Sequence, residues 1–214
     1  MLGLGIWYST KKTGKIKVNN MEKLEMEKVI SGLLTVNGCD PEKDTYVDIT
    51  RLSCRLGFNV GNAKLDESEE GFVAVRPSST KRKDTLGDNV IGVNRVREVV
   101  WKRFIIAHEL AHFVLHYKVG SLYLHKYNKK VEKGTEEKEA SYFAAALLMP
   151  RASFSLKYKK CKQSGLFGNA LLFRLSAIYK APLEIVAFRI EAIEEMEKDN
   201  DNVSTTHDLK VMSL

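Results

Sequence analysis

The chain is poor in cysteine and proline and has no long apolar run. Its 214 residues include 4 prolines and 3 cysteines, which are Cys39, Cys54 and Cys161. The odd number and the absence of a CxxC pair argue against a disulfide scaffold and favour a reducing compartment. The apolar stretch Tyr142–Met149 is far shorter than the roughly 20 residues that cross a bilayer. Since Met1–Tyr8 also lacks a signal-peptide pattern, we expect a cytoplasmic protein with no membrane partner.

The composition is that of a globular protein with a modest positive charge. Hydrophobic residues make up 44% of the chain and charged residues 29%. A chain of this length can bury a core without disulfides, and its composition excludes collagen-like and low-complexity classes. Lysine and arginine number 34 against 27 acidic residues, for a net charge of +7. This charge suits nucleic acid or an acidic partner without demonstrating either.

Apolar periodicity predicts an α+β fold. A spacing of 3.6 residues predicts helices, and short Val- and Ile-rich segments predict a small sheet, three-stranded and antiparallel. The expected helices span residues 21–34, 44–56, 99–117, 136–149, 167–179 and 182–196, and the expected strands span 58–65, 71–76 and 89–96. Residues 118–135 are expected to form a polar, lysine-rich connection. The predicted organisation is an N-terminal arm (1–20), a main domain (21–150), a C-terminal helical appendage (151–196) and a flexible tail (197–214).

The string His108-Glu109-Leu110-Ala111-His112 has the HExxH spacing. On a helix, His108 and His112 lie one turn apart on the same face, so both imidazoles can bind one metal ion. Glu109 flanks that position, where a carboxylate can accept a proton from a metal-bound water. The bland alternative is two core histidines and a surface glutamate. This alternative is disfavoured because a helix that is apolar all round would then bury three polar groups without partners.

A catalytic zinc ion usually has a third protein ligand. His116 continues the series, but it lies about 12 Å along the helix axis from His108, so we expect it to line the rim of the pocket or to pack. His125, in the lysine-rich connection, and His207, in the tail, are weaker candidates.

The next helix offers a better third ligand. Glu139 shares a face with Tyr142 and Phe143, which indicates that it points inward. Glu137 is rotated about 160° away from that face, and Glu136, one turn earlier, is the reserve candidate. An acidic first turn is also a generic helix feature, because carboxylates interact favourably with the helix dipole.

Two separated motifs resemble the ImmA/IrrE family of gluzincin-like metallo-endopeptidases. The resemblance covers roughly residues 45–150 and is specific, since the motifs agree in order and spacing. They are Arg103–His112 followed by Leu115-His116, and Glu139–Ala144 followed by Leu147–Pro150. The family's third ligand, a glutamate before an Ala-Asn pair, falls on Glu139, although Ser141 replaces the usual Asn.

The resemblance implies a zincin-like metallopeptidase core with one zinc ion per chain, held by His108, His112 and Glu139. Glu109 would then act as general base in peptide hydrolysis. The developing oxyanion needs a further donor. Three residues lie within sequence reach of it, and the sequence does not choose among them: Tyr142, His116 and Arg103.

A strand ahead of the active helix also resembles the family. In gluzincin-like sites the strand beside that helix is an exposed edge, to which an extended peptide adds by main-chain hydrogen bonds. The resemblance therefore implies a substrate-binding edge made of Val90, Ile91, Gly92, Val93 and Asn94.

The resemblance to family members of this size implies that the protein substrate is a helix-turn-helix repressor of a mobile element or stress regulon. The C-terminal helices resemble the helix-turn-helix-like appendage of the family, with Arg189 where an Arg is frequent. Direct DNA binding is the weaker expectation. The alternative function is a DNA- or protein-binding regulator with a non-catalytic zinc site, which an intact Glu109 disfavours. Peptide deformylase also uses HExxH, but Cys54 lacks the context of that enzyme's cysteine ligand.

Overall fold

The computed structural model describes residues 20–75, 89–118, 123–128 and 134–211, and in this part the protein has an α+β fold, as predicted. The helices are α2 (Asn20–Val36), α3 (Ile49–Arg55), α4 (Val99–His116), α5 (Thr135–Leu148), α6 (Arg151–Gln163), α7 (Gly168–Tyr179) and α8 (Leu183–Val211). The strands are β1 (Phe58–Ala63), β2 (Glu69–Val75), β3 (Asn89–Asn94) and β4 (Tyr123–Asn128). None of these helices is long and apolar enough to cross a membrane.

The strands form one mixed sheet in the order β1-β3-β2-β4. The three expected strands are present, and β4 joins them from within the segment expected to be a connection. β2 pairs antiparallel with β3 and β4, whereas β1 pairs parallel with β3. The expectation of an antiparallel sheet is therefore wrong for the β1–β3 pair, because the long connection from β1 through β2 brings β3 back in the same direction as β1.

The central position of β3 overturns the expected substrate edge. Gly92 pairs with Gly61 of β1 on one side and with Phe72 of β2 on the other. The same holds for Val90, Ile91 and Val93, and Asn94 pairs with β1. A strand whose main-chain groups are used on both sides cannot accept an added peptide, so this prediction is wrong. The edges of the described sheet are β1 and β4.

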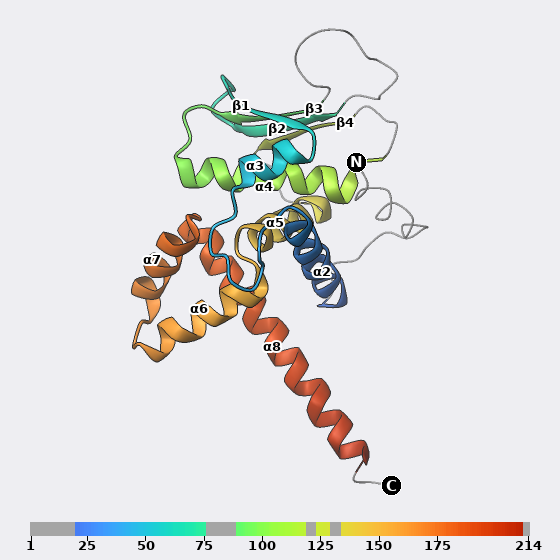
Figure 1. Cartoon of the computed structure of the whole chain (residues 1–214), viewed down its shortest axis with the longest axis vertical. Helices are drawn as coiled ribbons and strands as arrows, with labels where there is room; N and C mark the ends of the chain where they lie inside the picture. Colours follow the sequence, from blue (N-terminus) through green and yellow to red (C-terminus); the bar gives the residue numbers. More distant parts are fainter. Residues whose placement is uncertain (1–19, 76–88, 119–122, 129–133, 212–214) are drawn as a thin grey trace.

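Helix α4 lies directly against one face of the sheet and carries the HExxH residues (Figure 1). Every residue from Arg103 to His112 is buried, between the sheet on one side and α5 on the other. The approach of α4 to β2 depends on Gly71, because a Cβ there would lie 2.4 Å from Cγ2 of Ile105. Any larger side chain at this position would push the active helix away from the strand.

The C-terminal helices pack into the same apolar core as α2 and α5. The basic stretch within residues 157–162 belongs to α6, a helix that the sequence did not indicate. The turn between α7 and α8 places Lys180 in the left-handed region (φ 51°), and Ser176 Oγ donates a hydrogen bond to the Ala181 carbonyl. α8 continues to Val211, past the residue at which the tail was expected to begin. The expected arm lies outside the described residues, except for Asn20.

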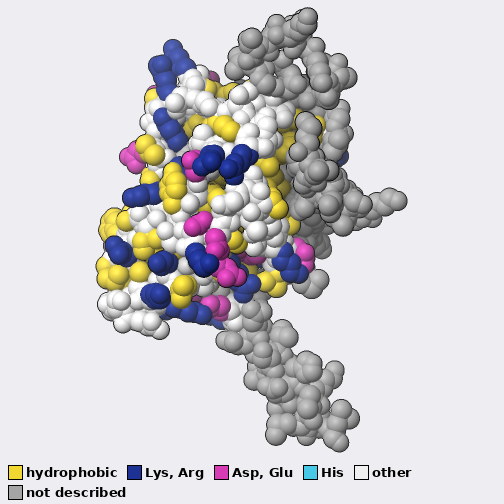
Figure 2. Space-filling view, viewed as in Figure 1, with side chains coloured by type: hydrophobic (Ala, Val, Ile, Leu, Met, Phe, Trp, Pro, Cys, Tyr) yellow, Lys and Arg dark blue, Asp and Glu magenta, His cyan; other side chains and the backbone are white. Residues whose placement is uncertain are grey.

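The described surface in Figure 2 mixes lysine and arginine with acidic and apolar side chains. No histidine is visible on this face, which agrees with the burial of His108 and His112. Among the described residues of this face, lysine and arginine form no continuous basic stripe of the kind that tracks a nucleic-acid backbone.

Candidate metal centre

Two turns of α4 and the first turn of α5 bring three metal-binding side chains together. His108 Nε2 and His112 Nε2 lie 3.1 Å apart. The Glu137 carboxylate lies beside both, with Oε2 at 3.2 Å from His108 Nε2 and Oε1 at 3.1 Å from His112 Nε2. Both histidines are fully buried, and Glu137 closes the group from the side that retains some exposure. The three residues form a group able to hold a metal ion.

The spacing of the two histidine nitrogens matches that of two ligands in a tetrahedral site. Ligands about 2.0–2.1 Å from a zinc ion lie about 3.3 Å from one another in such a site. The 3.1 Å separation of the two histidine nitrogens is close to that value, and Glu137 approaches His108 with Oε2 and His112 with Oε1. Two imidazoles and a carboxylate that meet in a largely buried place are the ligand types of catalytic zinc sites. The donor set therefore fits a metal ion.

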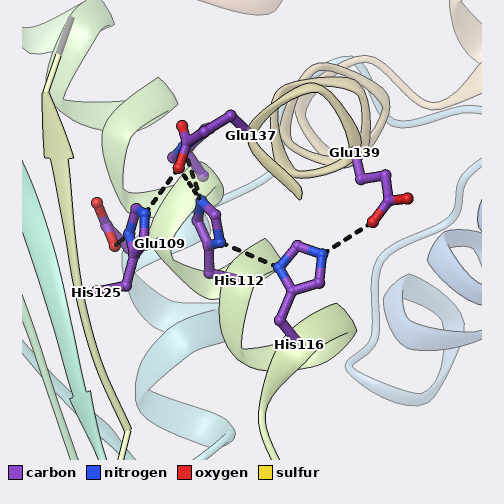
Figure 3. Close-up of polar contacts among 7 residues, drawn as sticks. Glu109, His112, His116, His125, Glu137 and Glu139 are labelled. Atoms are coloured by element: carbon purple, nitrogen blue, oxygen red, sulfur yellow. Dashed lines mark hydrogen bonds and ion pairs between the residues drawn. The ribbon is translucent and has the colours of Figure 1, made fainter. Parts of the chain in front are cut away.

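The glutamate at the histidine pair is Glu137, whereas the sequence pointed to Glu139. Glu139 Oε2 instead lies 2.9 Å from His116 Nε2, on the far side of the His116 ring (Figure 3). The prediction failed because α5 is buried on all sides from Glu139 to Leu148, so an apolar face does not indicate the direction of the site. The reserve candidate, Glu136, is exposed.

His125 reaches the centre from β4 and joins the metal group to Glu109 (Figure 3). Its Nδ1 lies 3.0 Å from Glu109 Oε2, and its Nε2 lies 2.7 Å from Glu137 Oε1. Its ring stacks on His112 with centroids 3.5 Å apart. His125 is a weaker candidate in the sequence analysis because of its lysine-rich surroundings. The two-residue spacing of His125 and Tyr127, which puts both on one side of a strand, was the signal that could have found it.

Burial and hydrogen bonding set the protonation of the centre. Burial lowers the pKa of His112 to about 4, so its imidazole is neutral at pH 7. Burial alone would also lower the pKa of His125, but its hydrogen bonds to Glu109 and Glu137 raise it to about 9. Burial alone would raise the pKa of Glu137, but its contacts with the three histidines outweigh that effect and lower it. Burial raises the pKa of Glu109.

Glu109 is completely buried, and its two oxygens differ in their contacts. Oε2 accepts the hydrogen bond from His125, whereas Oε1 has no hydrogen-bond partner among the described residues. A buried polar atom without a partner calls for an explanation. A carboxylate oxygen beside a metal group is suited to accept a proton from water, which is the role expected of Glu109.

Two of the expected oxyanion donors lie away from the centre, and that prediction is wrong for both. The Tyr142 hydroxyl donates to Glu27 of α2 at 2.7 Å, because its face of α5 packs toward α2 and α8. Arg103 donates to the carbonyls of Val47 and Lys180. The third, His116, adjoins the centre through His112, with their Nδ1 atoms 3.1 Å apart.

The cysteine alternative does not reach the centre. Cys54 is exposed on α3 and is no part of the metal group, which removes the deformylase-like arrangement. The side chain of His207 lies outside the described residues.

Comparison with known proteins gives one match. The model of the peptidase M78 family, described as the IrrE N-terminal-like domain, matches residues 62–191, more than half of the chain. The matched span contains α4, β4 and α5, and therefore every residue of the metal group, but it does not include α2. A search of curated proteins found no match.

Proposed function

The chain belongs to the peptidase M78 family, and on this premise we propose that it is a zinc-dependent endopeptidase that cleaves a helix-turn-helix transcriptional repressor. Membership in the family supports a metallopeptidase, and the donor set supports a metal ion. The choice of zinc rests on the ligand types, two imidazoles and one carboxylate, which are those of catalytic zinc sites with an open fourth position.

One observation carries the proposal: two histidine nitrogens 3.1 Å apart and the Glu137 carboxylate converge beside a buried carboxylate with one unpartnered oxygen. A structural zinc site would be closed by a fourth protein ligand and would need no base. Here the fourth residue at the centre, His125, is hydrogen-bonded to the carboxylates of Glu109 and Glu137. Among the described residues, the metal group therefore has three members.

The chain's own residues can supply the proton transfers of peptide hydrolysis. Zinc bound by His108, His112 and Glu137 would polarise the scissile carbonyl and acidify the attacking water. Glu109 accepts the proton of that water and can return it to the leaving amine. His125 fixes the Glu109 and Glu137 carboxylates relative to each other through its two N–H groups, which preserves the geometry of base and ligand.

The edge strand β4 is suited to hold an extended substrate. In the part of the sheet that the structure describes, β4 pairs with β2 on one side and lies last in the strand order. It also presents His125 to the centre, so a peptide added along its outer edge would pass the metal group. Main-chain pairing of this kind gives affinity without strong side-chain selectivity.

The proposed substrate is tested by first examining the neighbouring genes for a helix-turn-helix repressor and then purifying any repressor found there. Incubation of the zinc-loaded protein with that repressor should give two fragments by mass spectrometry. A chelator should stop the reaction, and added zinc should restore it. A protein that binds zinc and the operator DNA but cuts neither this repressor nor a peptide library would instead support the regulator alternative.

The metal content provides the first prediction. Elemental analysis of the purified protein is expected to show about one zinc ion per chain, as for a three-ligand catalytic site. His112→Ala and Glu137→Ala should lose it, because each removes a donor atom from the group. Glu139→Ala should keep the full stoichiometry at saturating zinc. Loss of zinc in Glu139→Ala together with full occupancy in Glu137→Ala would show that Glu139 is the ligand.

The second prediction concerns His125. His125→Ala removes both hydrogen bonds that fix Glu109 and Glu137, and kcat should fall about 10-fold to 100-fold, as for the loss of an outer-shell partner. KM for a short peptide should change much less, since the substrate's main-chain contacts remain. Both constants are measured at saturating zinc, with zinc content determined on the same sample. If the His125→Ala sample loses activity and also lacks zinc, His125 acts on metal binding instead.

A further inference from the structure

His116 and Glu139 lie beside the metal group but do not reach its centre. His116 Nδ1 is 3.1 Å from His112 Nδ1, and His116 Nε2 is 2.9 Å from Glu139 Oε2. The side chains of His116 and Glu139 are 10% and 8% exposed, so both belong to the interior. Figure 3 shows them in a row that leads away from the metal group, on the opposite side of His112 from His125. The His112–His116–Glu139 row therefore contacts the metal group through one ligand, His112, and His116 and Glu139 are not ligands themselves.

If His112 is a metal ligand, the hydrogens of this row can be placed in only one order. His112 must keep its Nε2 lone pair for the metal, so its proton lies on Nδ1. That N–H donates to His116 Nδ1, which leaves the His116 proton on Nε2. The Nε2–H then donates to the Glu139 carboxylate. Every hydrogen in this order meets an acceptor, whereas the reverse order would place a proton on His112 Nε2 and block the metal position.

On the basis of the proposed zinc site, we propose that His116 and Glu139 are positioning residues that hold His112 as its Nδ1–H tautomer and so set the affinity for the metal. Ligand histidines commonly donate their second nitrogen to a carboxylate or carbonyl, which fixes the ring and raises its basicity. In this protein a second histidine is inserted between the ligand and the carboxylate. The insertion accounts for Glu139 lying one histidine away from the centre.

Zinc affinity tests the proposal without any substrate. Competition with a calibrated chelator gives the Kd for zinc of the wild type, His116→Phe, Glu139→Ala, Glu139→Gln and the double variant His116→Phe/Glu139→Ala. The two single variants His116→Phe and Glu139→Ala are each expected to bind zinc about 10-fold to 100-fold more weakly. Glu139→Gln keeps an acceptor oxygen and should lose less. Glu136→Gln, an exposed carboxylate in the first turn of the same helix, should bind as the wild type does.

The double variant separates a row in series from two independent contacts. Because His116 reaches Glu139 and His112 in one chain, removing both should cost no more than removing one, so the losses should not add. Losses that multiply would overturn the proposal. So would an unchanged Kd in Glu139→Gln and His116→Phe, since the row would then be packing alone. Circular dichroism of each variant establishes that it is folded, and Glu139→Gln, the smallest change in shape, carries the test if His116→Phe is not.

The tautomers themselves are read from long-range ¹H–¹⁵N spectra of the zinc-loaded wild type. We expect a proton on Nδ1 of His112 and on Nε2 of His116. A His116 protonated on Nδ1 would overturn the row even in a protein that binds zinc normally, and the proposed function would stand. A wild type that binds no zinc would overturn the proposed function and the affinity role together.

Discussion

Replacing Glu109 by glutamine is expected to abolish cleavage of the repressor while leaving zinc bound. Glutamine keeps the shape of the side chain and an oxygen for His125, but its amide cannot take a proton from water. Glu109 is no member of the metal group, so the donor atoms stay in place. Loss of a general base should lower kcat by about 10²–10⁴-fold, and the assay is the rate of fragment formation at saturating zinc.

Two comparisons make this result specific to the base. Glu136→Gln, the same chemical change at an exposed position of α5, should cleave at the wild-type rate. Glu137→Gln should lose activity through loss of zinc, and extra zinc should restore part of it, whereas Glu109→Gln should not respond. A Glu109→Gln enzyme that cleaves at the wild-type rate would show that proton transfer runs through another residue, and the mechanism would need a different base.

The local parts of the site could be predicted from the sequence. The HExxH spacing places His108, Glu109 and His112 on one buried helix because helical geometry depends only on residue separation. The structure brings the two histidines together and buries the glutamate beside them. The α+β class followed in the same way from apolar periodicity, which is also a short-range property.

The non-local parts could not be predicted. Strand order is decided by which edges meet in space, so three adjacent apolar segments did not reveal that β3 lies between β1 and β2. A helix buried on all sides hides the direction of its functional residue, which is why Glu139 was preferred to Glu137. The position of His125 could not be predicted either, since it reaches the centre only because β4 adds to the sheet.

The ion pair between Glu27 and Arg189 is the clearest contact that sequence spacing could not predict, because 162 positions separate its partners. Both Arg189 Nη atoms donate to the Glu27 carboxylate, and Arg189 Nε donates to the carbonyl of Met149, the C-cap residue of α5. Arg189 is fully buried. The pair therefore ties α2, which lies outside the matched family span, to α8 and to the helix that carries Glu137.

Arg189→Met is accordingly expected to destabilise the protein strongly. It leaves a buried carboxylate without its cation, a change that costs about 3–5 kcal/mol of unfolding free energy. For a chain of this size, that loss lowers Tm by about 6–20 °C. Unfolding is followed in the presence of a chelator, so that metal binding does not add to the stability.

The control and the rescue decide whether charge burial is the cause. Lys159 of α6 pairs with Glu197 of α8, the helix that carries Arg189, at 3.0 Å, but these side chains are 59% and 37% exposed. Lys159→Gln should therefore cost at most about 1 kcal/mol. Glu27→Met added to Arg189→Met removes the stranded carboxylate and should recover much of the lost stability, since an apolar pair can replace a buried ion pair. A double variant as unstable as Arg189→Met would instead assign the loss to the hydrogen bonds that the pair makes with its neighbours, the Met149 carbonyl and the Tyr142 hydroxyl.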